Sequence, residues 1–296
     1  MKTFSLILLG MMMIALLGGT QDSKRVGEAY PLTICPVSKR PLGENPVVVI
    51  LEDMPESSMN GREVKFCCGG CSGRFMSDKT GNMNKLDEVI VKDQLKVYPV
   101  TNCIVMPEDE LADPRSPEAM EDKNVIIGNR LYRFCCKGCI RKFKKDPAKY
   151  IPKVDELIVA DQMPRYPKTM PCLVTEAKSL PDPSGSEAKD CTLIVYKNRL
   201  VRLCCTRCNK KFEADPAKYI AKLDAAAIKA QKADYPLTTC VVTGGNLKAS
   251  SPWFMIGDRA VTTCCGGCKG RAMKDPRGAV AKLDAAKKAG SKKTDA

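Results

Sequence analysis

The side chains of this sequence that are best suited to binding a metal ion or to thiol chemistry are cysteines, which occur in four groups. Each group has two adjacent cysteines, a third three positions after the pair, and an outlying cysteine farther upstream. With seventeen cysteines and no histidine, thiolates would supply the ligands. All-sulfur coordination favours soft or borderline ions, and we expect Zn²⁺ or Cu⁺, or another soft heavy metal, at about one ion per group. Group by group, the candidate metal ligands are Cys35, Cys67, Cys68 and Cys71; Cys103, Cys135, Cys136 and Cys139; Cys172, Cys204, Cys205 and Cys208; and Cys240, Cys264, Cys265 and Cys268.

The cysteine groups belong to an internal repeat. The outlying cysteines are separated by 68, 69 and 68 residues, a period that indicates an array of one repeated unit. Between the outlying cysteine and the adjacent pair, 31 residues intervene in three repeats and 23 in the fourth, which has a shorter loop. We expect the repeats to be modules at residues 30–92, 98–161, 166–230 and 235–286.

Each repeat contains the pattern of a β-hairpin. Short apolar runs flank Gly128-Asn129, Lys197-Asn198 and Gly257-Asp258, which are pairs that favour tight two-residue turns. The first repeat is less clear, because a loop separates its strand "PVVVILED" from Asn60-Gly61 and "REVKF". We therefore predict hairpins in the last three repeats and a less regular one in the first.

A helix is expected after each cysteine cluster. Asp146-Pro147 and its counterparts Asp215-Pro216 and Asp275-Pro276 combine an N-cap residue with the proline favoured in a first turn. The first repeat has "SDKTGN" instead, which predicts a frayed or irregular helix. The predicted fold is thus small α+β, with four tandem cysteine-knuckle modules of zinc-ribbon or treble-clef type, each a β-hairpin plus a helix around a thiolate site.

These motifs resemble a known superfamily. An outlying cysteine, a hairpin, "FC-x3-C" and a helix with "F…DP.KY" are similar to the TRASH/YHS superfamily of small heavy-metal-binding domains, over nearly all of residues 30–286. The resemblance implies metal sensing, trafficking or resistance, with the outlying cysteine and the first and third cysteines of each cluster as ligands. The chain departs from the family in its 31-residue loops, its lack of histidine and its extra cysteines, Cys68, Cys136, Cys205 and Cys265.

The second cysteine of each adjacent pair has two possible roles. Consecutive side chains of a strand point in different directions, so Cys67 and Cys68 need not face the same ion. Cys68 is either a fourth ligand reached through a turn or a neighbouring thiol used for capture and transfer. The sequence leaves both roles open.

Two alternatives use the same cysteines without metal. Sixteen cysteines divide into four per repeat, which would allow two disulfides in each repeat of an exported structural or interaction protein and leave Cys191 unpaired. Each cluster also contains Cys-x-x-Cys between a strand and a helix, as in a thiol–disulfide redox protein. Because histidine is absent and no paired carboxylates recur at matching positions, we expect no enzyme.

The beginning of the chain indicates export. Residues 1–20 combine a basic start, an apolar run and a small-residue exit, as a signal peptide does. We expect a secreted or periplasmic, envelope-associated protein with no membrane span after signal cleavage. The net charge of +14 and a basic, disordered tail at 287–296 would suit anionic envelope polymers or another envelope protein as partners. The export signal and only 5% aromatic residues argue against nucleic-acid binding.

Overall fold

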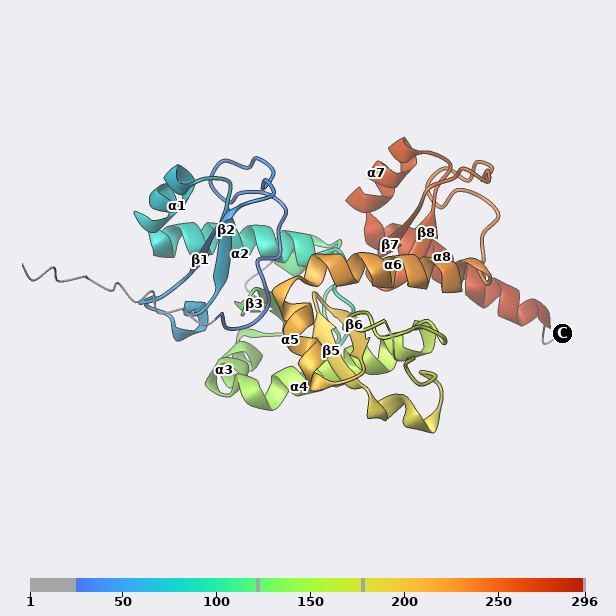
Figure 1. Ribbon diagram of the computed structural model, residues 1–296, viewed down its shortest axis with the longest axis horizontal. Helices are drawn as coiled ribbons and strands as arrows, with labels where there is room; N and C mark the ends of the chain where they lie inside the picture. Colours follow the sequence, from blue (N-terminus) through green and yellow to red (C-terminus); the bar gives the residue numbers. More distant parts are fainter. Residues whose placement is uncertain (1–24, 121–122, 177–178, 295–296) are drawn as a thin grey trace, which may run out of the picture.

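The computed structural model describes residues 25–120, 123–176 and 179–294, and its fold is α+β (Figure 1). The predicted signal peptide at 1–20 lies outside the described residues. Within them, the strands form four separate antiparallel hairpins, as predicted. These are β1 (Val47–Ile50) with β2 (Glu63–Phe66), β3 (Asn124–Ile127) with β4 (Arg130–Arg133), β5 (Thr192–Tyr196) with β6 (Arg199–Leu203), and β7 (Trp253–Ile256) with β8 (Arg259–Thr262).

Two helices follow each hairpin, where the sequence pattern predicted one. A short helix starts after the adjacent cysteines and stops at or just before an aspartate. The aspartate side chain then accepts a hydrogen bond from a backbone N–H of a second, longer helix, which separates the two helices. In chain order the pairs are α1 (Gly69–Met76) and α2 (Lys79–Leu95), α3 (Lys137–Lys145) and α4 (Pro147–Gln162), α5 (Thr206–Ala214) and α6 (Pro216–Lys232), and α7 (Gly266–Lys274) and α8 (Pro276–Thr294).

The helices of the first repeat are as regular as those of the others, so the expectation of an irregular helix was wrong, whereas its hairpin is less regular, as predicted. Its strands pair in register, with Val47 opposite Phe66, around a longer connection that includes a 3-10 turn at Ser57–Met59. Asp78 caps α2 by accepting a hydrogen bond from the Gly81 N–H at 3.0 Å. The aspartate alone therefore makes the cap, and the proline that follows it in the other repeats is dispensable.

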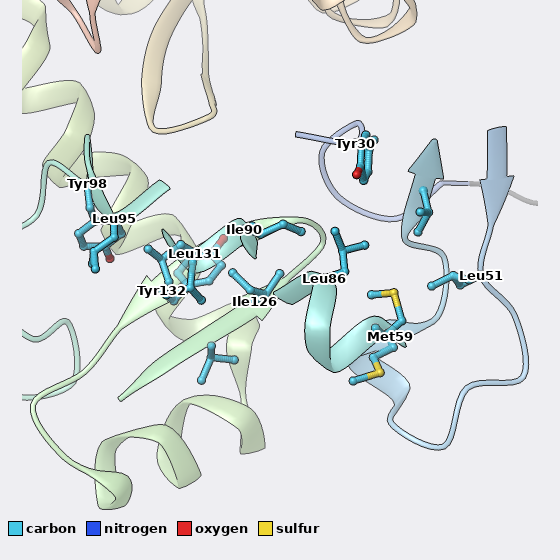
Figure 2. Close-up of a cluster of buried hydrophobic side chains, with 14 of the residues drawn as sticks. Tyr30, Leu51, Met59, Leu86, Ile90, Leu95, Tyr98, Ile126, Leu131 and Tyr132 are labelled. Carbon is cyan, nitrogen blue, oxygen red and sulfur yellow. The ribbon is translucent and has the colours of Figure 1, made fainter. Parts of the chain in front are cut away.

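The long helix of each repeat packs against the hairpin of the next repeat. α2 contacts β3 and β4, α4 contacts β5 and β6, and α6 contacts β7 and β8. Figure 2 shows the cluster that results between the first two repeats, with Leu51 and Met59 at one end, Ile90 of α2 between them and the second repeat, and Leu131 and Tyr132 beyond it. The repeats are therefore joined by packing as well as by the chain.

A glutamine at or near the end of α2, α4 and α6 fixes the hairpin that follows. Gln162 donates through Nε2 to the Asn198 carbonyl at 2.9 Å and accepts at Oε1 from the Leu200 N–H at 2.7 Å. Gln94 and Gln231 make the same pair of bonds at the other two junctions. Each glutamine satisfies two backbone groups that its hairpin leaves open.

An ion pair ties each hairpin to the long helix of its own repeat. The Arg62 side chain is 1% exposed and binds both carboxylate oxygens of Asp87, at 2.9 and 2.5 Å. Arginine forks match carboxylates in this bidentate manner. The pairs at matching positions are Arg130–Asp155, Arg199–Asp224 and Arg259–Asp284.

The segment at residues 25–31 crosses the turns of the second and third hairpins. The Glu28 N–H donates to the Gly128 carbonyl at 2.8 Å, and the Glu28 carboxylate accepts from the Lys197 N–H at 3.0 and 3.1 Å. Gly27 passes so close that a Cβ there would lie 2.3 Å from the Gly128 Cα, which requires glycine. The turns are thus held at the interior of the array.

The C-terminal helix α8 continues to Thr294. The basic segment from residue 287, expected to be a disordered tail, is therefore helical up to that residue. Half of residues 287–294 are lysines, which are good helix formers. Like the other helices that the structure describes, α8 is not long and apolar enough to cross a membrane.

Candidate metal centre

A tight turn presents the outlying cysteine of each repeat. In the first repeat Ile34 and Pro41 form an isolated antiparallel bridge, and within it the Lys39 N–H donates to the Cys35 carbonyl at 3.0 Å. Lys39 has a left-handed φ of 60°, which closes the turn. Isolated bridges also flank Cys103, Cys172 and Cys240. Backbone hydrogen bonds therefore fix the position of each outlying cysteine within its turn.

The hairpin and the short helix deliver the other three cysteines. β2 ends at Phe66, Cys67 follows it, and Cys68 is the N-cap of α1 with an extended backbone. Cys71 lies in the first turn of α1, which carries its sulfur back toward Cys67. Phe75 packs edge-on against Phe66 behind the cysteines, with ring centroids 5.2 Å apart. An apolar layer therefore backs the site.

Three sulfur atoms converge in every repeat. They belong to the outlying cysteine and to the first and third cysteines of the cluster, and their Sγ atoms lie within 4.8 Å of one another. A tetrahedral ion with Zn–S bonds of about 2.3 Å places its sulfurs about 3.8 Å apart. The distances between the first and third sulfurs are close to that value: 3.7 Å for Cys67–Cys71, 3.6 Å for Cys135–Cys139, 3.6 Å for Cys204–Cys208 and 3.5 Å for Cys264–Cys268.

The second cysteine of each pair lies beside this group of three. Its sulfur is not among those that are all within 4.8 Å of one another in the described residues. Of the sixteen predicted ligands, twelve therefore converge directly and four are adjacent. The adjacent sulfurs are those of Cys68, 4.0 Å from Cys67; Cys136, 3.6 Å from Cys139; Cys205, 3.6 Å from Cys208 and 3.8 Å from Cys204; and Cys265, 3.9 Å from Cys264.

The structure does not support the disulfide alternative. All seventeen cysteines are free thiols, and no sulfur contact in the clusters approaches the disulfide bond length of about 2.05 Å. Cys191, the extra cysteine of the third repeat, lies outside the cluster. It is buried, and the Arg202 guanidinium donates to its Sγ at 3.6 Å.

Backbone N–H groups surround the outlying sulfurs. Burial raises the pKa of the Cys35 thiol, but the N–H groups of Ser38 and Cys67 and the Ser38 hydroxyl outweigh burial and lower the pKa to about 6. By the same balance, with the Thr243 hydroxyl contributing, the pKa of Cys240 is lowered to about 6. A concavity of N–H groups favours an anion, so Cys35 and Cys240 are prepared to ligate as thiolates.

The two cysteines at the short helix have opposite tendencies. The backbone N–H of Cys71 lowers the pKa of Cys68. The Cys68 side chain makes no capping hydrogen bond, so this N–H acts on the thiol as a nearby dipole. Burial, together with the neighbouring thiols and the charge of Cys35, raises the pKa of Cys71 to about 12, since a second thiolate beside the first is disfavoured without a cation. A cation in the group would remove this penalty and release a proton.

Hydroxyl groups that the sequence analysis did not single out contact the sulfurs in three repeats. Each stands three positions after the outlying cysteine, in "CPVS", "CLVT" and "CVVT", so the repeat alignment contained the signal. In the second repeat Met106 takes this position, and the Asp109 side chain contacts Cys135 instead. The hydroxyls are those of Ser38, 3.3 Å from the Cys67 sulfur; Thr175, 3.9 Å from Cys204; and Thr243, 3.8 Å from Cys264.

A comparison of the chain with protein-family models, curated proteins and solved structures found no match. The chemistry of the site therefore follows from its own donor set. In each group of the described residues, the ligand atoms that all lie within 4.8 Å of one another are three sulfurs, with no carboxylate oxygen among them. Soft or borderline ions prefer such donors, whereas Mg²⁺ and Ca²⁺ require oxygen.

Proposed function

We propose that the chain is a metal-binding protein that holds one soft ion in each of its four cysteine groups, for sequestration, trafficking or resistance. The observation that carries the proposal is the fourfold recurrence of three sulfurs within 4.8 Å of one another. A chance cluster of thiols would not recur with the same backbone supports in four hairpins. Four sites in one chain suit capacity or multivalent binding better than catalysis.

The sulfur donors support Zn²⁺ or Cu⁺ as the ion, with another soft heavy metal as the alternative. Zn²⁺ is almost always four-coordinate, so it would require the second cysteine or water as a fourth ligand. Cu⁺ is well served by soft thiolates, and three converging sulfurs would suffice for it. X-ray absorption of the loaded protein distinguishes the two cases, because it counts the sulfur neighbours of the ion directly.

The order of the structural elements supports the resemblance noted in the sequence. Each repeat consists of a turn with one ligand, then a hairpin, then a helix that carries the last ligand. We propose that this arrangement is treble-clef-like. This order is also the one that the TRASH/YHS-like motifs imply, and we propose membership of that superfamily. Export to the envelope remains part of the proposal and rests on residues 1–20 alone.

The proposal is tested by titrating the reduced protein with Cd²⁺ and following the ultraviolet cadmium–thiolate absorption. We expect a break at about four equivalents, one for each cysteine group. Cys71→Ser should move the break to about three, because it removes one buried member of one group. Cys191→Ser is the matched control, since that thiol lies outside the clusters, and should keep the native break. Absence of thiolate absorption would contradict the proposal.

A thiol–disulfide exchange protein is the second candidate. The observation in its favour is that the sulfurs of Cys136 and Cys139 lie 3.6 Å apart at the N-terminus of α3. Such a protein would reduce a disulfide substrate catalytically, and Cys136→Ser would abolish the reduction. The metal proposal predicts no turnover in the same assay.

A further inference from the structure

The sulfurs of each site lie at graded depths below the surface. The outlying cysteines are 0–2% exposed and the third cysteines 2–5%, so both kinds are buried. The first cysteine of each pair is partly exposed. The second cysteine of the pair is exposed in the first, second and fourth repeats and partly exposed in the third repeat. An incoming molecule would therefore reach the second cysteine, Cys68 in the first repeat, before any other sulfur.

Helix stability does not explain a cysteine at this position. The second cysteine is the N-cap of the short helix in all four repeats, with extended backbone and no side-chain capping hydrogen bond. Serine, threonine, aspartate or asparagine would cap the helix better. Its thiol therefore does not cap the helix and instead contacts the group of three, at 3.6 Å from the Cys139 sulfur in the case of Cys136.

We propose that Cys68, Cys136, Cys205 and Cys265 are handover thiols, through which the ion enters and leaves the buried group of three. The proposal rests on the proposed function, that these groups hold soft ions. In the first step a bond forms between the ion and the handover sulfur, and the bond to the partly exposed first cysteine breaks. In the second step acceptor thiolates bond to the ion in place of the outlying and third cysteines, whose bonds to the ion break, and the handover sulfur departs last. Each thiol that becomes a ligand loses its proton, each departing thiolate takes one up, and no electrons change hands.

The charge around the handover thiol indicates the acceptor. The four short helices carry twelve basic residues and one acidic residue, Glu213, and none has an acidic residue in its first turn. In Figure 1, α1, α3 and α7 lie at the periphery of the molecule. Opposite charges draw partners together, so the structure favours an acceptor thiol carried on an anionic molecule.

The test uses the full chain loaded with Cd²⁺ and compares it with the variant in which all four handover cysteines are serine. Equilibrium stoichiometry is read from the cadmium–thiolate absorption, and transfer is followed by stopped flow after addition of glutathione, an anionic thiol, or cysteamine, a cationic one. The variant should keep about four ions and transfer them at least about tenfold more slowly, because a pre-placed thiol is lost. Native transfer should be faster to glutathione, and added salt should reduce that advantage.

Controls and other outcomes keep the proposal separate from the proposed function. Thr206→Ala, an exposed change next to Cys205 without loss of sulfur, should transfer at the native rate. If the four-serine variant binds fewer ions, the second cysteine is a structural ligand and the handover role is wrong. If it binds four ions and transfers them at the native rate, the handover role is wrong while the sites stand. If the native protein binds no Cd²⁺, the proposed function itself fails.

Discussion

The junction between the second and third repeats gives the most quantitative prediction. Gln162 is 3% exposed and connects α4 to the next hairpin through the Asn198 carbonyl and the Leu200 N–H. Gln162→Ala leaves both backbone groups buried and without their partner. Each such group costs about 1–3 kcal/mol, so we expect the two together to lower the free energy of unfolding by about 2–6 kcal/mol. That loss is a large part of the roughly 5–15 kcal/mol by which domains are stable.

The assay is urea unfolding followed by circular dichroism, with hydrogen exchange at the Leu200 amide. Exchange of that amide should accelerate strongly in the variant, because its acceptor is gone. Glu156→Ala on the exposed side of the same helix is the matched control, and should change the free energy of unfolding by no more than about 0.5 kcal/mol.

The equivalent glutamine in the next junction provides an internal comparison. Gln231 bonds the Asp258 carbonyl and the Ala260 N–H, both at 2.8 Å, but it is only partly buried. Gln231→Ala should therefore cost less than Gln162→Ala, because water can replace its bonds. The single tryptophan, Trp253 in β7, reports this junction by fluorescence. A loss below about 1 kcal/mol for Gln162→Ala, or a larger loss for Gln231→Ala, would refute the reasoning.

Three further predictions concern charge and protons. Asp87→Asn removes the counter-charge of the buried Arg62 side chain and should lower the free energy of unfolding, measured by urea unfolding, by about 3 kcal/mol. An unchanged urea midpoint would contradict the pairing. Because the pKa of Cys35 and of Cys240 is lowered to about 6, the apparent affinity for Cd²⁺ should fall more steeply with falling pH below about 6 than above it; an affinity that does not change with pH would contradict thiolate ligation. Burial raises the pKa of Glu28 from 4.5 to about 7, against opposing effects of Arg130 and Lys197. Its contribution to stability is therefore full below about pH 4.5 and lost as the pH rises through 7, by up to about 3 kcal/mol, and Glu28→Gln should abolish that part of the pH dependence of urea unfolding.

Local chemistry was the part of this structure that the sequence could predict. The paired turn residues Gly128-Asn129 and Lys197-Asn198 form left-handed hairpin turns, and the Asp146-Pro147 motif caps a helix. These features depend on short stretches of chain, where backbone preference decides the outcome. The convergence of the outlying cysteines with the clusters was also predicted, because one outlying cysteine accompanies every cluster in the pattern of a metal-binding knuckle.

The hydrogen bonds between repeats could not be predicted from the sequence around the residues that form them. Nothing local distinguishes Gln162 from a solvent-exposed glutamine, and its role depends on a hairpin 36 residues later in the chain. The separation of each helical region into two helices was missed for a related reason. Asp146 was recognised as an N-cap, but the sequence did not show that the cysteine helix before it is a full element. The placement of the second cysteines beside the groups of three depends on side-chain direction, which the pattern left open.

The central claim is that the four groups bind metal, and native mass spectrometry of the full chain tests it most directly. The protein should be purified without chelator or reductant, so that one mass reports both bound ions and hydrogens lost to disulfides. The account predicts the mass of the polypeptide plus about four soft ions, with the thiols unoxidised and the ion named by the mass increment. A mass with no metal and about sixteen hydrogens missing would mean eight disulfides, and would contradict the account.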